Sequence, residues 1–329
     1  MKIKIFIKRF KKLTFKKFIF RCRLFFLFKI LNKHWCTYFF YKSYWHSLLN
    51  VKKRNKKSKI EKNYMSINVN PGAGIGHQIS NYNSGIWFAK KFDLFHAHSS
   101  FSDKKWEKLL NFGSSSIHSK NIIKSGYQKI LLPIFDEKNF NEISKVKKII
   151  ESYRDKKIIF FLEFDQYYKK QYEVAPIIEK KFFISKERKK NKIIFKKKYY
   201  NIAVHVRAGD ITSNKKIKEK RFLDVDYFIL AINKALSIIK TKKKIKIHIF
   251  SQFYDSSFLK FNKFKNIHFF YHFNQYKTFL HFVYSDLLIT SKSSFSYKAG
   301  LISKNIKIAP KVFWHSYPKN DKKWILLNR

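Results

Sequence analysis

The stretch IAVHVRAGDITS, residues 202–213, is an apolar strand pattern that runs into an arginine, a glycine and an aspartate. Arg207 is one of only nine arginines, whereas lysine supplies most of the 72 basic side chains. A guanidinium presents a planar fork of donors that grips phosphate or carboxylate oxygens two at a time. Arg207 at the end of a buried strand therefore predicts an anion-binding position, with a structural ion pair as the alternative.

Polar side chains also come directly after two other strand patterns of the C-terminal half, at 245–250 and 287–290. The carboxyl ends of parallel strands share one edge of a sheet, where ligands of α/β proteins bind. Hydroxyls and unpaired N–H groups at a helix start suit a phosphate. For the serines, simple helix capping is the alternative. We expect one pocket around Arg207 that includes Gly209, Asp210, Ser251, Gln252, Ser291, Ser293, Ser294 and Phe295.

The elements that would position these residues alternate along the chain. Helix patterns at 224–240, 275–284 and 294–302 separate strand patterns at 202–206, 245–250, 267–270, 287–290 and 306–309. Asp224 or Asp226 is the candidate N-cap of the first helix. Such alternation predicts a parallel sheet with helices on both faces.

A similar unit precedes this half. Residues 65–92 read as a strand, a glycine-rich turn and a helix, with Ile79, Tyr82, Ile86 and Ala89 at helical spacing. Glycine in such a turn lets a ligand or another segment approach the backbone. Residues 157–165 predict another buried strand, with Glu163 and Asp165 at its carboxyl end.

The first sixty residues differ from the rest in charge and aromatic content. No acidic residue precedes Glu61, and basic pairs alternate with apolar runs such as 24–28. A membrane-spanning helix needs about 20 apolar residues, more than any uncharged run here supplies. The pattern predicts either an interfacial anchor on an anionic membrane, formed by residues 1–62, or a disordered basic tail. Charge interrupts the apolar part, so we do not expect a signal peptide.

The basic charge does not by itself identify a partner. The formal net charge is +51, but lysine is spread over every region of the 329 residues. Nucleic-acid binding requires basic residues that are patterned on one face, so specific nucleic-acid binding is not expected. Cys22 and Cys36 lie away from the motifs and cannot form a metal site by themselves. A non-catalytic basic protein that binds nucleic acid or membrane remains the alternative from outside the enzyme class.

Three segments resemble the fucosyltransferase superfamily, which includes bacterial and animal α-1,2-fucosyltransferases. HVRAGD at 205–210 is similar to its H-x-R-x-G-D signature, residues 74–92 to its glycine turn and helix, and residues 285–303 to its serine-rich segment. The resemblance implies an α/β fold of the GT-B type, with two Rossmann-like domains that contain parallel sheets. The expected organisation is a basic aromatic segment at 1–64, an acceptor-side domain at 65–198 and a donor domain at 199–329.

The resemblance also implies a metal-independent inverting glycosyltransferase that transfers fucose from GDP-fucose to a glycan acceptor, without a cofactor. Arg207 inherits the role of binding the β-phosphate. His205 lies inside the strand, so we expect it to have a structural hydrogen-bonding role. The expected donor-binding residues are His205, Arg207, Gly209, Ser251, Ser293, Ser294 and Phe295. The glycine turn brings Gly74, Gly76, His77 and Gln78 to the cleft.

Inverting transfer benefits from a base that accepts the proton of the acceptor hydroxyl. The sequence leaves four candidates open: Asp210, His77, Glu163 and Asp165. The departing diphosphate gains negative charge, which an arginine and helix N–H groups can stabilise. We therefore take Arg207, Asp210 and His77 as the catalytic candidates.

The chain departs from the family pattern at several positions. Ala208 stands where α-1,2-fucosyltransferases usually carry a second arginine, and His77 stands where they carry asparagine. Tyr297 and Lys298 replace a common tryptophan pair. Ala208 removes a cation from near the donor site. The nearest alternative to a fucosyltransferase is therefore a glycosyltransferase that uses another nucleotide sugar.

Two further expectations concern location and the C-terminus. The expected location is the cytoplasm, with peripheral attachment to the inner face of the membrane if residues 1–62 bind lipid. Trp314, His315 and Trp324 lie in a closing aromatic segment at 312–324. For these aromatic side chains we expect core packing rather than acceptor binding.

Overall fold

The computed structural model describes residues 22, 38–50, 63–69, 73–114, 116–163, 168–207 and 221–328. The chain forms two compact units. The first contains the described parts of 1–72, 88–102 and 117–167, and the second contains 73–87, 103–116 and 168 onward. The expected interfacial anchor at 1–62 lies outside the described residues except for residues 22 and 38–50.

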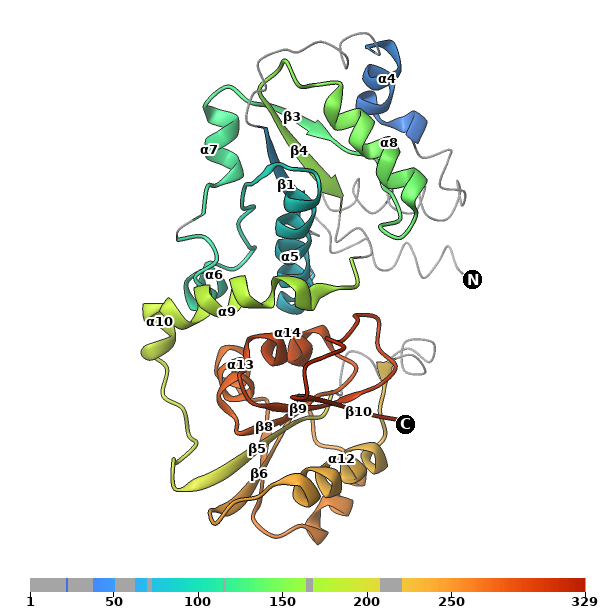
Figure 1. Cartoon of the computed structure of the whole chain (residues 1–329). Coiled ribbons are helices and arrows are strands. Elements are labelled where there is room, and N and C mark those ends of the chain that lie inside the picture. The colour runs from blue at the N-terminus through green and yellow to red at the C-terminus, as the bar shows by residue number, and fades with distance from the viewer. Residues whose placement is uncertain are drawn as a thin grey trace. The chain divides into compact units, whose positions relative to one another are not determined.

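The first unit is built on a four-stranded parallel sheet (Figure 1). Its strand order is β2-β1-β4-β3, with bounds β1 Tyr64–Asn68, β2 Phe95–His96, β3 Gln128–Leu131 and β4 Ile158–Glu163. Every residue of β4 is buried, as its unbroken apolar pattern requires. The sequence indicated β1 and β4 but not β2 and β3.

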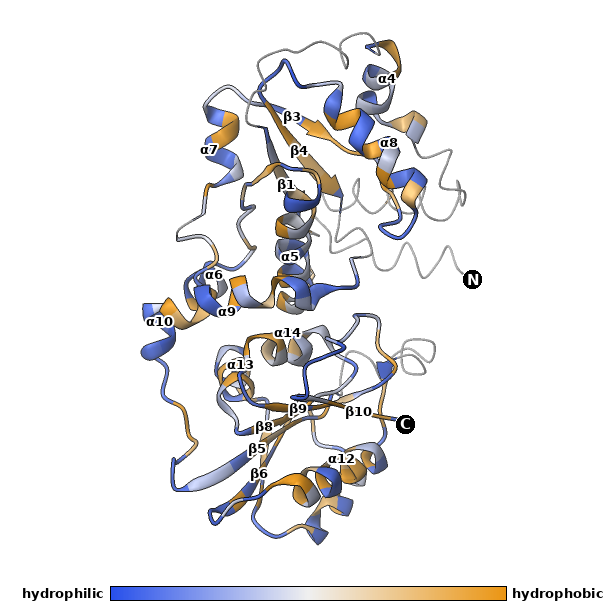
Figure 2. Ribbon diagram, in the orientation of Figure 1, coloured by the Kyte–Doolittle hydropathy of each residue, from blue (hydrophilic) through white to orange (hydrophobic). Residues whose placement is uncertain are grey.

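Helices cover both sides of this first sheet. Ile122 of α7 (Ser119–Lys124) packs against Ile159 and Phe161 of β4. The helix α8 (Phe140–Glu151) buries Val146, Ile149 and Ile150, and Figure 2 shows its striped surface of hydrophobic and hydrophilic residues. Asn139 caps α8 by accepting hydrogen bonds from the first helical N–H groups. Two short N-terminal elements, η2 (Tyr38–Phe40) and α4 (Lys42–Leu49), precede β1.

The second unit contains a six-stranded sheet in which all described pairs are parallel. Its order is β7-β6-β5-β8-β9-β10, which is 3-2-1-4-5-6 when the strands are counted from β5. This is the order of the Rossmann fold. The bounds are β5 Tyr199–His205, β6 Lys244–Ser251, β7 Ile267–Tyr271, β8 Leu287–Ile289, β9 Ile306–Pro310 and β10 Trp324–Leu327. The expected α/β fold with two parallel sheets is confirmed.

Helices lie on both faces of the second sheet, with α12 on one and α13 and α14 on the other (Figure 1). The bounds are α12 Val225–Ile238, α13 Gln275–Tyr284 and α14 Ser294–Ile302, so all three predicted helices are confirmed. Asp224 caps α12 by accepting a hydrogen bond from the Tyr227 amide at 3.0 Å. Asp226, the other cap candidate, instead pairs with Lys260 at 3.0 Å.

Strand β10 was not predicted from sequence, and neither were the remaining elements of the second unit. They are α6 Lys104–Leu110, η4 Gln171–Val174, α9 Ala175–Ile184, α10 Lys186–Lys189 and η5 Ser256–Lys263. The predicted helix after the glycine turn is α5 (Ile75–Lys91), whose first part, to Trp87, belongs to the second unit. One sheet lies within 64–163 and the other within 199–327, and the expected domain boundary at 198 and 199 stays a prediction.

Candidate active site

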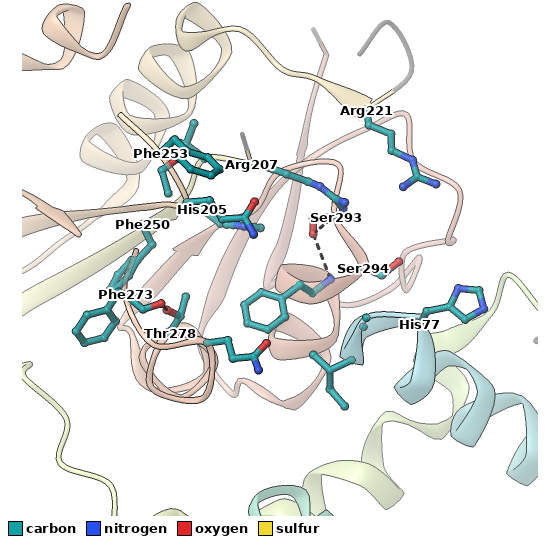
Figure 3. Close-up of a pocket in the computed structure, with 18 of the residues that line it drawn as sticks. His77, His205, Arg207, Arg221, Phe250, Phe253, Phe273, Thr278, Ser293 and Ser294 are labelled. Atoms are coloured by element: carbon teal, nitrogen blue, oxygen red, sulfur yellow. Dashed lines mark hydrogen bonds between the residues drawn. The ribbon is translucent and has the colours of Figure 1, made fainter. Parts of the chain in front are cut away.

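The predicted pocket residues lie at the carboxyl ends of adjacent strands in the second unit. Strand β5 pairs with β6 on one side and β8 on the other, so the strand order reverses at β5. Such a reversal leaves a crevice at the edge of the sheet. A cavity of about 690 Å³ lies there, lined by residues that come after β5, β6 and β8 (Figure 3).

Arg207 is held at the start of α14. Its Nη1 donates a hydrogen bond to Ser293 Oγ at 3.3 Å, and the same oxygen accepts from the Phe295 amide at 3.3 Å. Ser293 is thus the N-cap of α14 as well as a contact of the arginine. Ser293 therefore caps the helix and also lines the cavity, because its Oγ contacts both the Phe295 amide and Arg207.

The first turn of α5 approaches the start of α14 at Gly76. A Cβ at Gly76 would lie 2.7 Å from the Phe295 nitrogen and 2.8 Å from the Ser294 carbonyl carbon. Only glycine permits this approach of two backbones. The N-termini of two helices therefore meet at one wall of the cavity, where their partial positive charges add. Gly74 also lines the cavity, and a Cβ there would meet nothing within 4 Å.

His205 is a neutral ring packed beside the arginine. Ser291 Oγ lies 3.1 Å from His205 Nδ1, and the ring contacts Phe282 and Phe295 with centroids 5.1 and 5.9 Å away. Burial, and then the positive charge of Arg207, lower the pKa of His205 to about 3. The ring therefore carries no charge near neutral pH and contributes hydrogen bonding and packing.

Ser294 connects the C-terminal aromatic segment to the pocket wall. Its Oγ accepts a hydrogen bond from Trp314 Nε1 at 3.1 Å and lies 3.3 Å from His315 Nε2. His315 is buried and stacks on Tyr297 at a centroid distance of 5.0 Å. Trp324 is buried at the start of β10. Core packing is confirmed for His315 and Trp324, whereas Trp314 lines the cavity.

Aromatic side chains form the opposite wall of the cavity. Figure 3 shows Phe250, Phe253 and Phe273 on one side, with Arg207 reaching from there toward Ser293 and with Arg221 and His77 beyond. Phe253 is 49% exposed and contacts the His272 ring at a centroid distance of 5.0 Å. Gln252, Gln275 and Thr278 add polar groups to the lining of the cavity.

The cavity is cationic. Arg207 and Arg221 line it, and none of the described lining residues is aspartate or glutamate. The Arg221 guanidinium lies over the Trp314 ring, 5.3 Å from its centroid. Arg221 was not predicted as a site residue, because it stands in a lysine-rich stretch without a strand pattern. The only feature of the sequence that could have indicated it is that it is one of nine arginines.

The other predicted site residues fall into three groups. His77 lines the cavity, and its Nε2 is buried without a hydrogen-bond partner among the described residues. Ser251 lines it too, whereas Gln78 folds back and donates to the Ala73 carbonyl at 2.8 Å. Glu163 belongs to the first unit and accepts a hydrogen bond from Tyr41 at 2.6 Å. Gly209, Asp210 and Asp165 lie outside the described residues.

Metal ligands do not gather in the described part of the chain. No three histidine, cysteine, aspartate or glutamate side chains there lie close enough to hold a metal ion.

No protein-family model and no curated protein matches the chain. Solved structures do. The fucosyltransferase NodZ from Bradyrhizobium is 11% identical over 74% of this chain and 94% of that chain, with a TM-score of 0.43. POFUT1 in complex with GDP is 12% identical over 75% and 98%, with a TM-score of 0.44. A mutant of Arabidopsis thaliana FUT1 in complex with GDP is 10% identical over 85% and 76%, with a TM-score of 0.42.

Proposed function

We propose that the second unit binds a nucleoside diphosphate sugar and that the protein is an inverting glycosyltransferase. The observation that carries the proposal is the cationic wall made by Arg207 and the starts of α5 and α14. A diphosphate is the ligand that best matches a guanidinium fork beside helix N–H groups. The cavity volume of about 690 Å³ lies within the range of small-molecule sites.

The two walls suggest how the donor lies. The diphosphate would contact Arg207 and the start of α14, and the nucleobase would stack on the aromatic side near Phe253. Base stacking on an aromatic ring contributes about 1–3 kcal/mol in nucleic-acid complexes. Gln252, Gln275 and Thr278 offer hydrogen bonds to the base edge. This orientation leaves the sugar on the side of Arg221 and His77.

The transfer step depends on this placement. The acceptor hydroxyl attacks the anomeric carbon from the face opposite the diphosphate, the bond from that carbon to the diphosphate oxygen breaks, and the anomeric configuration inverts. Arg207 and the helix N–H groups stabilise the charge that develops on the diphosphate. Of the described base candidates, His77 lines the cavity, so it is the first candidate to accept the hydroxyl proton; Asp210 stays the second candidate.

The donor we favour is GDP-fucose, and the acceptor we favour is a glycan. The choice depends on the likeness of residues 74–92, 205–210 and 285–303 to fucosyltransferase segments. Ala208 stands where a second arginine is usual in the family. Other nucleotide sugars should therefore be tested beside GDP-fucose.

The test is donor turnover by the full chain. We would incubate it with GDP-fucose and with UDP-, CMP- and dTDP-linked sugars and measure release of the nucleotide with and without a glycan mixture. Arg207→Ala should lower turnover at least about 100-fold, because charge-assisted hydrogen bonds contribute about 1.5–3 kcal/mol each. Arg154→Ala is the matched control, since this arginine lies in the first unit and is 45% exposed beside Glu151. Equal turnover by the two variants would refute the proposal.

A further inference from the structure

The helix α4 in the first unit carries its apolar residues on the outside. Trp45, Leu48 and Leu49 are 46%, 45% and 82% exposed, whereas Ser43 and Ser47 are 2% and 4% exposed. A helix on the surface of a globular protein normally buries its apolar stripe and exposes its polar face. Among the described residues, the arrangement in α4 is the reverse.

Contacts of the inner face fix this orientation. Ser43 Oγ donates to the Leu131 carbonyl at 2.7 Å, and His46 Nδ1 lies 3.0 Å from Ser152 Oγ. The His46 ring stacks on Tyr153 at a centroid distance of 3.8 Å. Rotating α4 to bury its leucines would break each of these contacts, so the apolar face stays outward.

The preceding turn extends the same surface. Phe39 and Phe40 are 44% and 55% exposed, and Trp45 Nε1 donates to the Phe39 carbonyl at 2.9 Å. The rings of Phe39 and Trp45 lie 5.5 Å apart. We call the surface formed by Phe39, Phe40, Trp45, Leu48 and Leu49 the outer aromatic face.

Described basic side chains lie near this face, and Glu142 of α8 is an acidic neighbour of Tyr38. Lys42 on α4 is exposed, and Lys145 of α8 lies over the Tyr38 ring at 5.6 Å. Every charged residue that precedes Glu61 is lysine or arginine. Cations beside exposed tryptophan, phenylalanine and leucine are typical of a surface that lies in the headgroup region of an anionic bilayer. No helix in the described part of the chain is long and apolar enough to cross a bilayer.

We propose that the outer aromatic face docks the first unit on the surface of an anionic lipid bilayer. Trp45, Leu48 and Leu49 enter the interface, and Lys42 contacts the lipid phosphates. Nucleic acid would also attract the cations, but phosphates and ribose offer nothing to the exposed leucines. The proposal does not depend on the activity of the second unit.

The test is flotation of the full chain with vesicles of phosphatidylcholine, with and without a quarter of phosphatidylglycerol. We expect binding to the anionic vesicles that falls at high salt. The triple variant Trp45→Ser, Leu48→Ser and Leu49→Ser should bind at least tenfold more weakly. The matched control is Leu230→Ser, Leu236→Ser and Leu259→Ser, which removes leucines of the second unit that are 50%, 37% and 61% exposed and should bind like the wild type.

A second measurement locates the contact. Lipids brominated near the glycerol should quench part of the tryptophan fluorescence, and Trp45→Phe should lose that part while it keeps vesicle binding. Three results would overturn the proposal: no vesicle binding by the full chain, equal binding by the triple variant, or a wild-type dimer that the triple variant abolishes without change in vesicle binding. The last result would identify a self-association surface instead.

Discussion

The two sheets differ at the edge where their strands end. In the first unit, β4 ends at Glu163, a buried carboxylate that accepts a hydrogen bond from Tyr41. In the second unit, the residues after β5 and β8, Arg207 and Ser293, line a cavity. Among the described residues, the end of β4 is therefore closed by a polar contact, whereas the ends of β5 and β8 open on a pocket.

Apart from Arg207→Ala, the largest expected effect concerns the glycine that lets two helix starts meet. Gly76→Ala places a methyl group 2.7 Å from the Phe295 nitrogen, so the start of α5 or of α14 must shift at the wall of the cavity. Overpacking of this kind costs about 1–3 kcal/mol. We expect up to about 100-fold weaker nucleotide binding, measured by calorimetric titration. Gly74→Ala is the matched control because a Cβ there meets nothing within 4 Å. Equal affinities of the two variants would show that the approach of the helices is unimportant.

Lys307 of β9 tests whether stability in the second unit can change without a change at the pocket. This lysine is 2% exposed, and burial lowers its pKa from 10.5 to about 8. Between these values the unfolded chain holds a proton that the folded chain lacks, so this lysine makes the protein more stable as pH rises from 8 to 10.5.

Lys307→Met should therefore stabilise the protein at pH 7 by up to about 3 kcal/mol, reduced by loss of the hydrogen bond from Lys307 Nζ to the Ser303 carbonyl. The advantage should shrink as pH rises through 8 toward 10.5 and should leave nucleotide affinity unchanged. Urea unfolding of both proteins across this pH range measures the difference. A constant difference at all pH values would show that Lys307 keeps an ordinary pKa.

The smallest effect is expected at the closed edge of the first sheet. Tyr41→Phe removes the hydroxyl that donates to Glu163 at 2.6 Å and leaves a buried carboxylate oxygen without that partner. We expect a loss of about 1–2 kcal/mol in the free energy of unfolding and unchanged donor turnover. Glu163→Gln should cost less, because an amide oxygen can still accept the hydrogen bond. If either variant instead lost turnover at unchanged stability, Glu163 would act as a base.

The main elements of the second unit were easier to predict from sequence than those of the first. Five strands of the second unit carry apolar or alternating patterns that the sequence predicted, and the helices at 275–284 and 294–302 have the predicted bounds, whereas β10 was not predicted. In the first unit, β2 has two residues and β3 reads QKIL, so neither carries a strand pattern. Short strands are stabilised by their neighbours in the sheet, and this contribution cannot be read from local sequence.

The site was predictable where chemistry and strand ends coincide. Arg207 and Ser293 were identified because the rule for parallel sheets places both at one edge. Trp314 and Arg221 were not, because Trp314 lies in a segment without regular structure and Arg221 follows a stretch that carries no strand pattern. Their positions depend on tertiary contacts, such as the hydrogen bond from Trp314 to Ser294. The outward apolar face of α4 could not be predicted from sequence either, since the direction in which one face of a helix points depends on the contacts that its opposite face makes.

The most direct test of the central claim is calorimetric titration of the full chain with GDP, GMP and guanosine, beside Arg207→Ala. If the cationic wall binds a diphosphate, GDP should bind at least about 100-fold more tightly than guanosine, with GMP between them. Arg207→Ala should remove most of that difference. Equal affinity for GDP and guanosine, or wild-type affinity for GDP in Arg207→Ala, would contradict the account.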